Sequence, residues 1–195
     1  MHRLGSVGFR PINFWRVLNT FDVCQTAGMN QMIRILGVDP GLRHTGWGVI
    51  TMEGPRLAWV AHGVIHPDTK ADLADRLTEL ATQLRLVCDA HQPDEAAVEE
   101  TFVNINPKST LLLGQARGAA MATLAGAGLK VHEYATRKVK LSVVGAGGAD
   151  KDQVAFMVRR LLPKAGNVSA DAADALAVAI CGAHHRPLPT QRLKA

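Results

Sequence analysis

The positions of apolar and polar residues divide the chain into short strand-like runs followed by longer helical ones. Apolar runs at 33–38, 46–50 and 57–65 are separated by turn-forming residues, among them Asp39-Pro40-Gly41 and the Gly-Pro pair after Glu53. Runs of this length bounded by glycine and proline predict β-strands. Because the connections are short, we expect these three strands to form an antiparallel meander.

After residue 70 the spacing of apolar residues becomes that of helices. From Leu73 to Val87 they recur at alternating intervals of four and three, which predicts an amphipathic helix. Two more strands are predicted at 96–98 and 130–134. Further helices are predicted at 107–126, 136–144, 154–161 and 170–183, the last one capped by Ser169. This order predicts an α/β fold, a mixed five-stranded sheet with helices on both faces.

Residues 1–31 differ from the rest because they show no sustained period and contain a single acid, Asp22. A basic, acid-poor leader is typical of an organellar transit peptide. The simpler interpretation is that Met32 is the natural start, since a strand follows it directly. We therefore expect 32–185 to form the folded domain, 1–31 to lie outside it as an extension, and 186–195 to be a tail.

Charge is distributed unevenly along the chain. Residues 1–100 contain 9 Lys and Arg against 12 Asp and Glu, whereas residues 101–195 contain 13 against 5. A basic half beside an acidic half fits a protein that binds a polyanion with one surface and a metal with another. A solvated basic helix face explains the same pattern equally well.

The cysteines and the apolar stretches indicate where the protein works. Cys24, Cys88 and Cys181 are sparse and contain no C-x-x-C pair, which argues against a disulfide framework and a cysteine-based zinc site. The most apolar stretch, 111–129, includes Gln115 and an arginine, so it does not read as a membrane span. We expect a reducing cytoplasmic location.

Four carboxylates stand where predicted strands end or where the last helix begins: Asp39, Glu99, Asp171 and Asp174. Taken singly, each is explained by a turn, a strand end or a helix N-terminus. However, Asp171 and Asp174 share one helical face, and neighbouring first and fourth strands would bring all four together. Four clustered carboxylates repel one another, so they favour the binding of Mg²⁺ or Mn²⁺. These ions promote phosphodiester hydrolysis. The sequence therefore predicts a metal-dependent nuclease.

Several segments resemble the motifs of the RuvC-type Holliday-junction resolvases, in the same order. They are LGVDPG at 36–41 with TGWG at 45–48, AVEETF at 97–102, LGQARG at 113–118, the basic segment 139–145 with Lys151, and DAADALA at 171–177. The resemblance extends from about residue 32 to residue 183, and this combination of motifs is specific.

The resemblance implies a ribonuclease-H-like fold and a homodimer that cuts four-way DNA junctions by paired symmetric nicks, in recombination and repair. It assigns Asp39, Glu99, Asp171 and Asp174 as catalytic residues that bind one or two Mg²⁺ ions per subunit, with Mn²⁺ as a substitute. An association with a branch-migration helicase is also implied.

The same resemblance indicates residues that contact DNA. Phe102 lies where the family has an aromatic residue that stacks on a base, although a partly buried core residue would look the same. Lys140 and Lys151 correspond to family lysines near the cleaved strand, which fits phosphate contacts.

The sequence departs from the family pattern at two positions. Ile105 and Leu112 stand where lysine is common in the family, and this loss weakens phosphate binding or shifts it onto Lys108 and Arg117. Ile105 could instead contact unstacked bases. A stripe of small residues follows in the same helix, which we interpret as a packing face or a dimer contact. It consists of Gly114, Gly118, Ala122 and Gly126.

Three other functions compete with a junction nuclease. Actin-like kinases also begin with a strand and Asp-x-Gly, but they need a second lobe that this chain has no room for. A nuclease of the same fold acting on RNA fits less well, because Asp174 and the long basic segment favour junction DNA. A non-catalytic binder of DNA structures would be favoured by the loss of one acid, yet all four are present.

Overall fold

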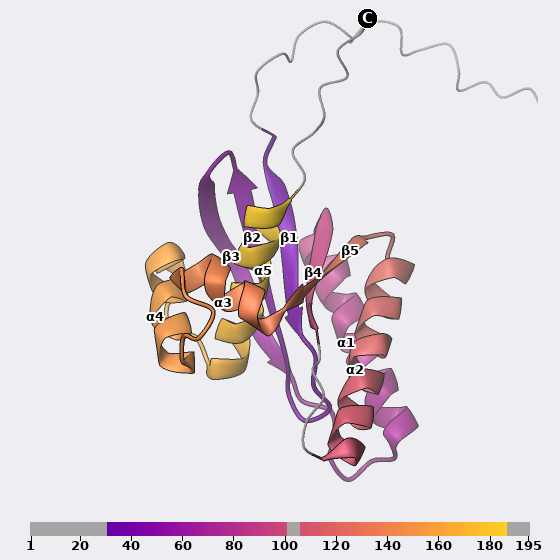
Figure 1. The fold of residues 1–195 in the computed structure, drawn as a ribbon. Coiled ribbons are helices and arrows are strands. Elements are labelled where there is room, and N and C mark those ends of the chain that lie inside the picture. The colour runs from indigo at the N-terminus through magenta and orange to yellow at the C-terminus, as the bar shows by residue number, and fades with distance from the viewer. Residues whose placement is uncertain (1–30, 101–105, 187–195) are drawn as a thin grey trace, which may run out of the picture. The chain divides into compact units, whose positions relative to one another are not determined.

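The computed structural model describes residues 31–100 and 106–186, and they contain one five-stranded sheet with helices on both of its faces (Figure 1). The strands are β1 Ile33–Asp39, β2 Thr45–Glu53, β3 Arg56–Ile65, β4 Glu95–Glu100 and β5 Lys130–Ala135. Their order across the sheet is β3-β2-β1-β4-β5. The first three pair antiparallel, whereas β4 runs parallel to β1 and β5 parallel to β4. The predicted mixed sheet, its meander and the pairing of the first and fourth strands are confirmed.

The helices agree with the predicted ones in number and order. They are α1 Leu73–His91, α2 Pro107–Gly126, α3 Thr136–Val144, α4 Lys151–Leu161 and α5 Ala170–His185, with a 3-10 turn, η1, at Pro163–Ala165. The start of α4 is set by a capping box, in which the Asp150 side chain accepts from the backbone N–H of Gln153 and the reverse bond also forms. Ser169 occupies the N-cap position of α5, but its side chain makes no capping hydrogen bond, so the predicted cap is wrong in that respect.

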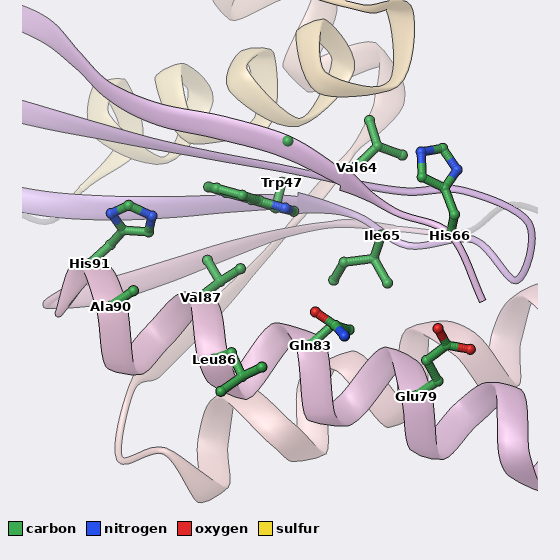
Figure 2. Close-up of a pocket in the computed structure, with 11 residues that line it drawn as sticks. Trp47, Val64, Ile65, His66, Glu79, Gln83, Leu86, Val87, Ala90 and His91 are labelled. Carbon is green, nitrogen blue, oxygen red and sulfur yellow. The ribbon is translucent and has the colours of Figure 1, made fainter.

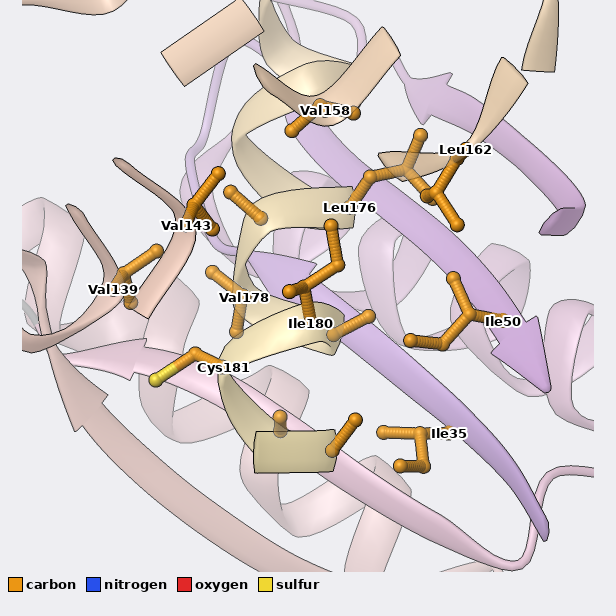
Figure 3. Close-up of a cluster of buried hydrophobic side chains, with 14 of the residues drawn as sticks. Ile35, Ile50, Val139, Val143, Val158, Leu162, Leu176, Val178, Ile180 and Cys181 are labelled. Atoms are coloured by element: carbon orange, nitrogen blue, oxygen red, sulfur yellow. The ribbon is translucent and has the colours of Figure 1, made fainter. Parts of the chain in front are cut away.

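Two hydrophobic clusters lie on opposite faces of the sheet. On one face, α3, α4 and α5 bury the cluster shown in Figure 3, where Ile35 of β1 lies with Leu176 and Ile180 of α5. On the other face, α1 and α2 cover Leu36 and Val38. Successive side chains of a strand point to opposite faces, which is why neighbouring residues of β1 belong to different clusters.

Helix α5 lies very close to the sheet. A Cβ atom added at Gly37 would collide with the carbonyl oxygen of Ala175, and one at Gly46 would collide with the carbonyl oxygen of Asp171. The alanines of α5 are buried in this contact, as their small size predicts. The close approach holds the first turns of α5 beside the last residues of β1 and the first residues of β2.

Helix α2 turns its glycines outward. A Cβ at Gly114, Gly118 or Gly126 would meet nothing within 4 Å. The buried face of α2 is instead Ala116, Ala120 and Leu124, which belong to the cluster shared with α1. Within the described residues nothing packs against these glycines, so a dimer contact is the form of packing that stays open as a prediction. Neither α2 nor another helix of the described residues is long and apolar enough to cross a membrane.

Candidate active site

Three of the four predicted acids line one pocket of about 170 Å³. Asp39 ends β1, and Glu99 lies next to the end of β4. Because β1 and β4 are parallel and Val38 is level with Val98, their last residues emerge side by side. Asp174 reaches the same pocket from the beginning of α5. The predicted convergence of these three carboxylates at one end of the sheet is what the fold produces.

The carboxyl group of Asp39 has a strongly raised pKa in this pocket. Burial raises its pKa, and the nearby charges of Glu99 and Asp174 raise it further, to about 7. Lys151 opposes the rise and Asp171 adds to it. A carboxylate among other carboxylates is costly to ionise without a compensating cation. This electrostatic arrangement favours the binding of a positive group.

Glu99 is oriented by a hydrogen bond that sequence reasoning missed. The hydroxyl group of Thr136, the first residue of α3, donates to Oε1 of Glu99. Burial raises the pKa of Glu99, while this hydrogen bond and the charges of Lys151 and Lys140 lower it. A threonine at the start of a helix is common, so its role could be recognised only once the ends of β4 and β5 were known to be adjacent.

Both predicted basic residues of the site line the pocket. Nζ of Lys151 lies 3.2 Å from Oδ2 of Asp174, and this contact raises the pKa of Lys151. Lys140 reaches the pocket from α3. The side chain of Lys151 is mostly exposed, at 78%, whereas that of Asp174 is mostly buried, so the ammonium group is open to a second anion from solvent.

Asp171 lies beside this pocket rather than in it. It lines an adjoining cleft of about 420 Å³ together with Gly41, Arg43, Arg76 and Leu112. It still acts electrostatically on Asp39. Within residues 31–100 and 106–186, no three histidine, cysteine, aspartate or glutamate side chains form a ready-made metal-binding group.

The remaining predicted DNA contacts are found on α2 or outside the described residues. Lys108 is exposed in the first turn of α2, where the side chain of Asn106 caps the helix. The guanidinium group of Arg117 is paired with the carboxylate of Glu133 on β5, so binding a phosphate there would require this pair to open. Phe102 and Ile105 lie outside the described residues.

A second groove, of about 420 Å³, lies between the edge strand β3 and α1 (Figure 2). Trp47, Leu86 and His91 are among its lining residues. It contains none of the predicted site residues. The concentration of acidic and basic side chains therefore distinguishes the pocket at the ends of β1 and β4 as the candidate active site.

Comparison with known proteins gives matches over most of this chain. A family profile described as crossover junction endodeoxyribonuclease RuvC matches residues 35–182. The crossover junction endodeoxyribonuclease RuvC of Hyphomonas neptunium is 61% identical over 164 residues, which cover 84% of this chain and 98% of that protein. The protein of the same name from Caulobacter vibrioides is 60% identical over 153 residues, covering 78% and 90%.

Solved structures give the same result. Thermus thermophilus RuvC, determined in complex with a Holliday junction substrate, has a TM-score of 0.72 and 30% identity, covering 77% of this chain and 93% of that one. The yeast mitochondrial Holliday junction resolvase Ydc2 has a TM-score of 0.57 at 15% identity, covering 80% and 79%. The second likeness concerns the fold alone, and both confirm the predicted ribonuclease-H-like architecture.

Proposed function

This chain belongs to the family of crossover junction endodeoxyribonuclease RuvC, and we propose on that basis that it resolves four-way (Holliday) DNA junctions in recombination and repair. The observation that carries the proposal is the pocket in which Asp39, Glu99 and Asp174 meet Lys140 and Lys151. Lysine ammonium groups attract the anionic oxygens of a phosphodiester, and carboxylates can hold a metal cation on the other side of the bond that breaks.

The family is one of metal-dependent nucleases, and we propose Mg²⁺ as the metal, with Mn²⁺ as its substitute, at one or two ions per subunit. Asp39, Glu99 and Asp174 would hold it, with Asp171 joining from the adjoining cleft. The donor set fits, because it consists of oxygen ligands alone and because burial, together with the mutual repulsion of these carboxylates, raises the pKa of Asp39 to about 7. Bound there, such an ion would activate a water molecule and stabilise the leaving oxygen.

The residues of the chain contribute position and charge. Thr136 holds one oxygen of Glu99, which fixes the direction of the other. Lys140 and Lys151 would bind the phosphates on either side of the scissile bond. Because Lys151 already faces a carboxylate at 3.2 Å, its ammonium group remains in the pocket until DNA arrives.

Further DNA contacts are proposed outside the pocket. Lys108, exposed at the start of α2, would bind a backbone phosphate, and Arg117 would do so if its pair with Glu133 opened. Phe102 would stack on a base at the branch point, a contribution of about 1–3 kcal/mol. Leu112 lines the cleft that contains Asp171, so the lysine common at that position would have added a cation there.

We propose that the protein acts as a homodimer that joins through the outward face of α2. This face carries glycines with open space above them, and it continues to Leu111, which is 65% exposed. Small residues allow two helices to approach closely, and an exposed leucine gains by being covered. Two active sites related by a twofold axis would make the paired symmetric nicks.

The dimer proposal can be tested at Gly118. Gly118→Leu adds a bulky side chain where a single chain has free space, so the fold should persist while the dimer dissociates. Sedimentation should then give half the mass of the unaltered protein. Ala74→Leu, at an exposed position of α1, is the matched control and should leave the mass unchanged. Equal dissociation constants for the Gly118 variant and the unaltered chain would contradict the proposal.

Residues 32–185 are proposed to form the nuclease domain, with 1–31 as an extension and 186–195 as a tail. The proposal is supported by the contacts between residues, which form a compact unit that begins at Gln31. We further propose a cytoplasmic location, which fits the buried, free thiols of Cys88 and Cys181, and a branch-migration helicase as a partner.

The proposed activity is tested with a synthetic four-way junction in the presence and absence of Mg²⁺, with linear duplex and single-stranded DNA as controls. Cleavage of the junction alone supports it. Asp89→Asn is a suitable control variant, because Asp89 forms an exposed ion pair with Arg85 on α1 and does not line the pocket.

A further inference from the structure

The cleft that adjoins the active site is lined by two arginines, Arg43 and Arg76, which we call the arginine cleft. It lies between the loop 40–44, which connects β1 to β2, and the helices α1 and α2. The metal chemistry and the predicted DNA contacts use neither arginine. Asp171 lines the same cleft and interacts with Asp39, so the cleft and the active site are neighbours.

Two contacts hold the loop that carries Arg43, one with Thr45 at the start of β2 and one with α1. The hydroxyl group of Thr45 donates to the carbonyl of Gly41 at 2.7 Å and accepts from its N–H at 3.0 Å. One amino group of Arg76 donates to the carbonyl oxygen of Leu42 at 2.6 Å. Groups held in this way lose little conformational entropy when a ligand binds.

A pair of histidines holds the other side of the loop. Nδ1 of His44 lies 2.8 Å from Nδ1 of His66, which follows β3, and the two rings meet edge to face. Arg43 lies between two residues of this fixed loop, Leu42 and His44, and its own side chain is exposed. The loop therefore presents a free cation from a rigid support.

Positive charge is in excess in the arginine cleft. Within the part of the chain that the structure describes, Arg43 makes no hydrogen bond or ion pair, and Arg76 pairs with no carboxylate. Nε of Arg76 is buried without a partner among the same residues. Asp171 is the one acid among the described lining residues. Guanidinium groups bind phosphate oxygens in a forked geometry, so two of them beside one carboxylate favour a phosphate.

We propose that the arginine cleft binds a backbone phosphate of the cleaved DNA strand, next to the phosphate that is cut, through Arg43 and Arg76. This inference rests on the proposed function, because it needs a DNA strand in the acidic pocket. Asp171 lines the cleft and acts on Asp39 in the pocket, so a strand that leaves the pocket on this side would pass over the cleft. Leu112 supplies an apolar wall for the sugar.

The inference is tested by the salt dependence of junction binding in EDTA, where cleavage stops. Arg43→Gln removes one cation, and the slope of log K against log salt should become less negative by about 0.9 between roughly 50 and 200 mM salt. The double variant R43Q/R76Q should change the slope by about twice as much. Arg43→Lys should restore most of it. Arg56→Gln removes an exposed arginine at the start of β3, at the end of the sheet opposite to the pocket, and should leave the slope unchanged.

A slope for Arg43→Gln equal to that of the unaltered protein would overturn the inference, as would an equal loss for Arg56→Gln. A merely structural role would lower the melting temperature without changing the slope. If the unaltered protein neither prefers nor cuts the junction, the proposed function fails and this inference fails with it. If it does both while R43Q keeps its slope, the inference alone fails.

Discussion

The ammonium group of Lys151 lies 3.2 Å from the carboxylate of Asp174, in the pocket that also contains Asp39 and Glu99. Lys151 is the first residue of α4, and the capping box of Asp150 fixes where that helix begins. The lysine thus supplies a positive charge to carboxylates that otherwise repel one another.

Lys151→Met removes this charge. We expect the DNA-free protein to bind Mg²⁺ more tightly, because the lysine no longer competes for the carboxylates, while junction cleavage slows by about tenfold or more, in the range of a lost charged contact. Calorimetry of Mg²⁺ binding and single-turnover cleavage measure the two effects. Lys164→Met, at an exposed lysine of η1, serves as the control. Weaker Mg²⁺ binding by Lys151→Met would contradict this role.

Asp39→Asn should change how the stability of the metal-free protein depends on pH. The pKa of Asp39 is raised from 3.8 to about 7, so folding favours its protonated form. The contribution of protonated Asp39 to the free energy of unfolding is fully present below about pH 4 and is lost as the pH rises through 7. Asparagine does not ionise, so its variant should be more stable than the unaltered protein at pH 8, by up to about 4 kcal/mol, and equally stable near pH 4.

Chemical denaturation in EDTA at several pH values measures this difference. Glu99 and Asp174 repel the ionised Asp39, so the asparagine variant also relieves this repulsion, which adds to its advantage at high pH. Added Mg²⁺ should reduce the advantage of the variant, because the unaltered site gains more from the ion. Parallel stability curves for the two proteins would show that Asp39 ionises as an ordinary aspartate.

Thr136→Val removes the hydroxyl group that donates to Glu99. Because that hydrogen bond lowers the pKa of Glu99, its loss should raise this pKa and move the acidic limb of the pH–rate profile to higher pH. Cleavage rates measured between pH 5 and 9 report this shift. Thr136→Ser keeps the hydroxyl and should keep the profile. Identical profiles for the valine variant and the unaltered protein would exclude a role for this bond.

Gly37→Ala tests the close contact between α5 and the sheet. A methyl group there meets the carbonyl of Ala175, so α5 must shift, and we expect a loss of at least about 3 kcal/mol in the free energy of unfolding. The shift would also displace Asp174 and reduce cleavage. Gly148→Ala is the control, because a Cβ atom there meets nothing within 4 Å, so unchanged stability is expected. A Gly37 variant as stable as the Gly148 variant would contradict the packing described for α5.

The sequence predicted the strands and helices because their periods are regular and their ends are marked by proline, glycine and capping residues. It also predicted that Asp39 and Glu99 meet, since both follow buried strands. For the stripe on α2 the sequence predicted a packing face without its partner, because a run of small residues indicates close contact but does not identify what it contacts.

Other features of the site depend on tertiary contacts between distant segments. The hydrogen bond from Thr136 to Glu99 exists because β4 and β5 are parallel neighbours. The pairing of Arg117 with Glu133 likewise needs the packing of α2 against β5. Arg43 carried one signal in the sequence, its place two residues after the Asp-Pro-Gly turn, but its freedom from carboxylate partners became visible only in the fold.

The most direct test of the account is cleavage of a synthetic four-way junction in Mg²⁺ by the unaltered chain, Asp39→Asn, Asp171→Asn and the control Asp89→Asn. We predict paired nicks in opposing strands by the unaltered chain and the control, bound but uncut junction for the two active-site variants, and uncut linear duplex throughout. Junction that is bound yet left intact by the unaltered chain in Mg²⁺ or Mn²⁺, or cut equally well by Asp39→Asn, would contradict the assignment of these carboxylates as a nuclease active site.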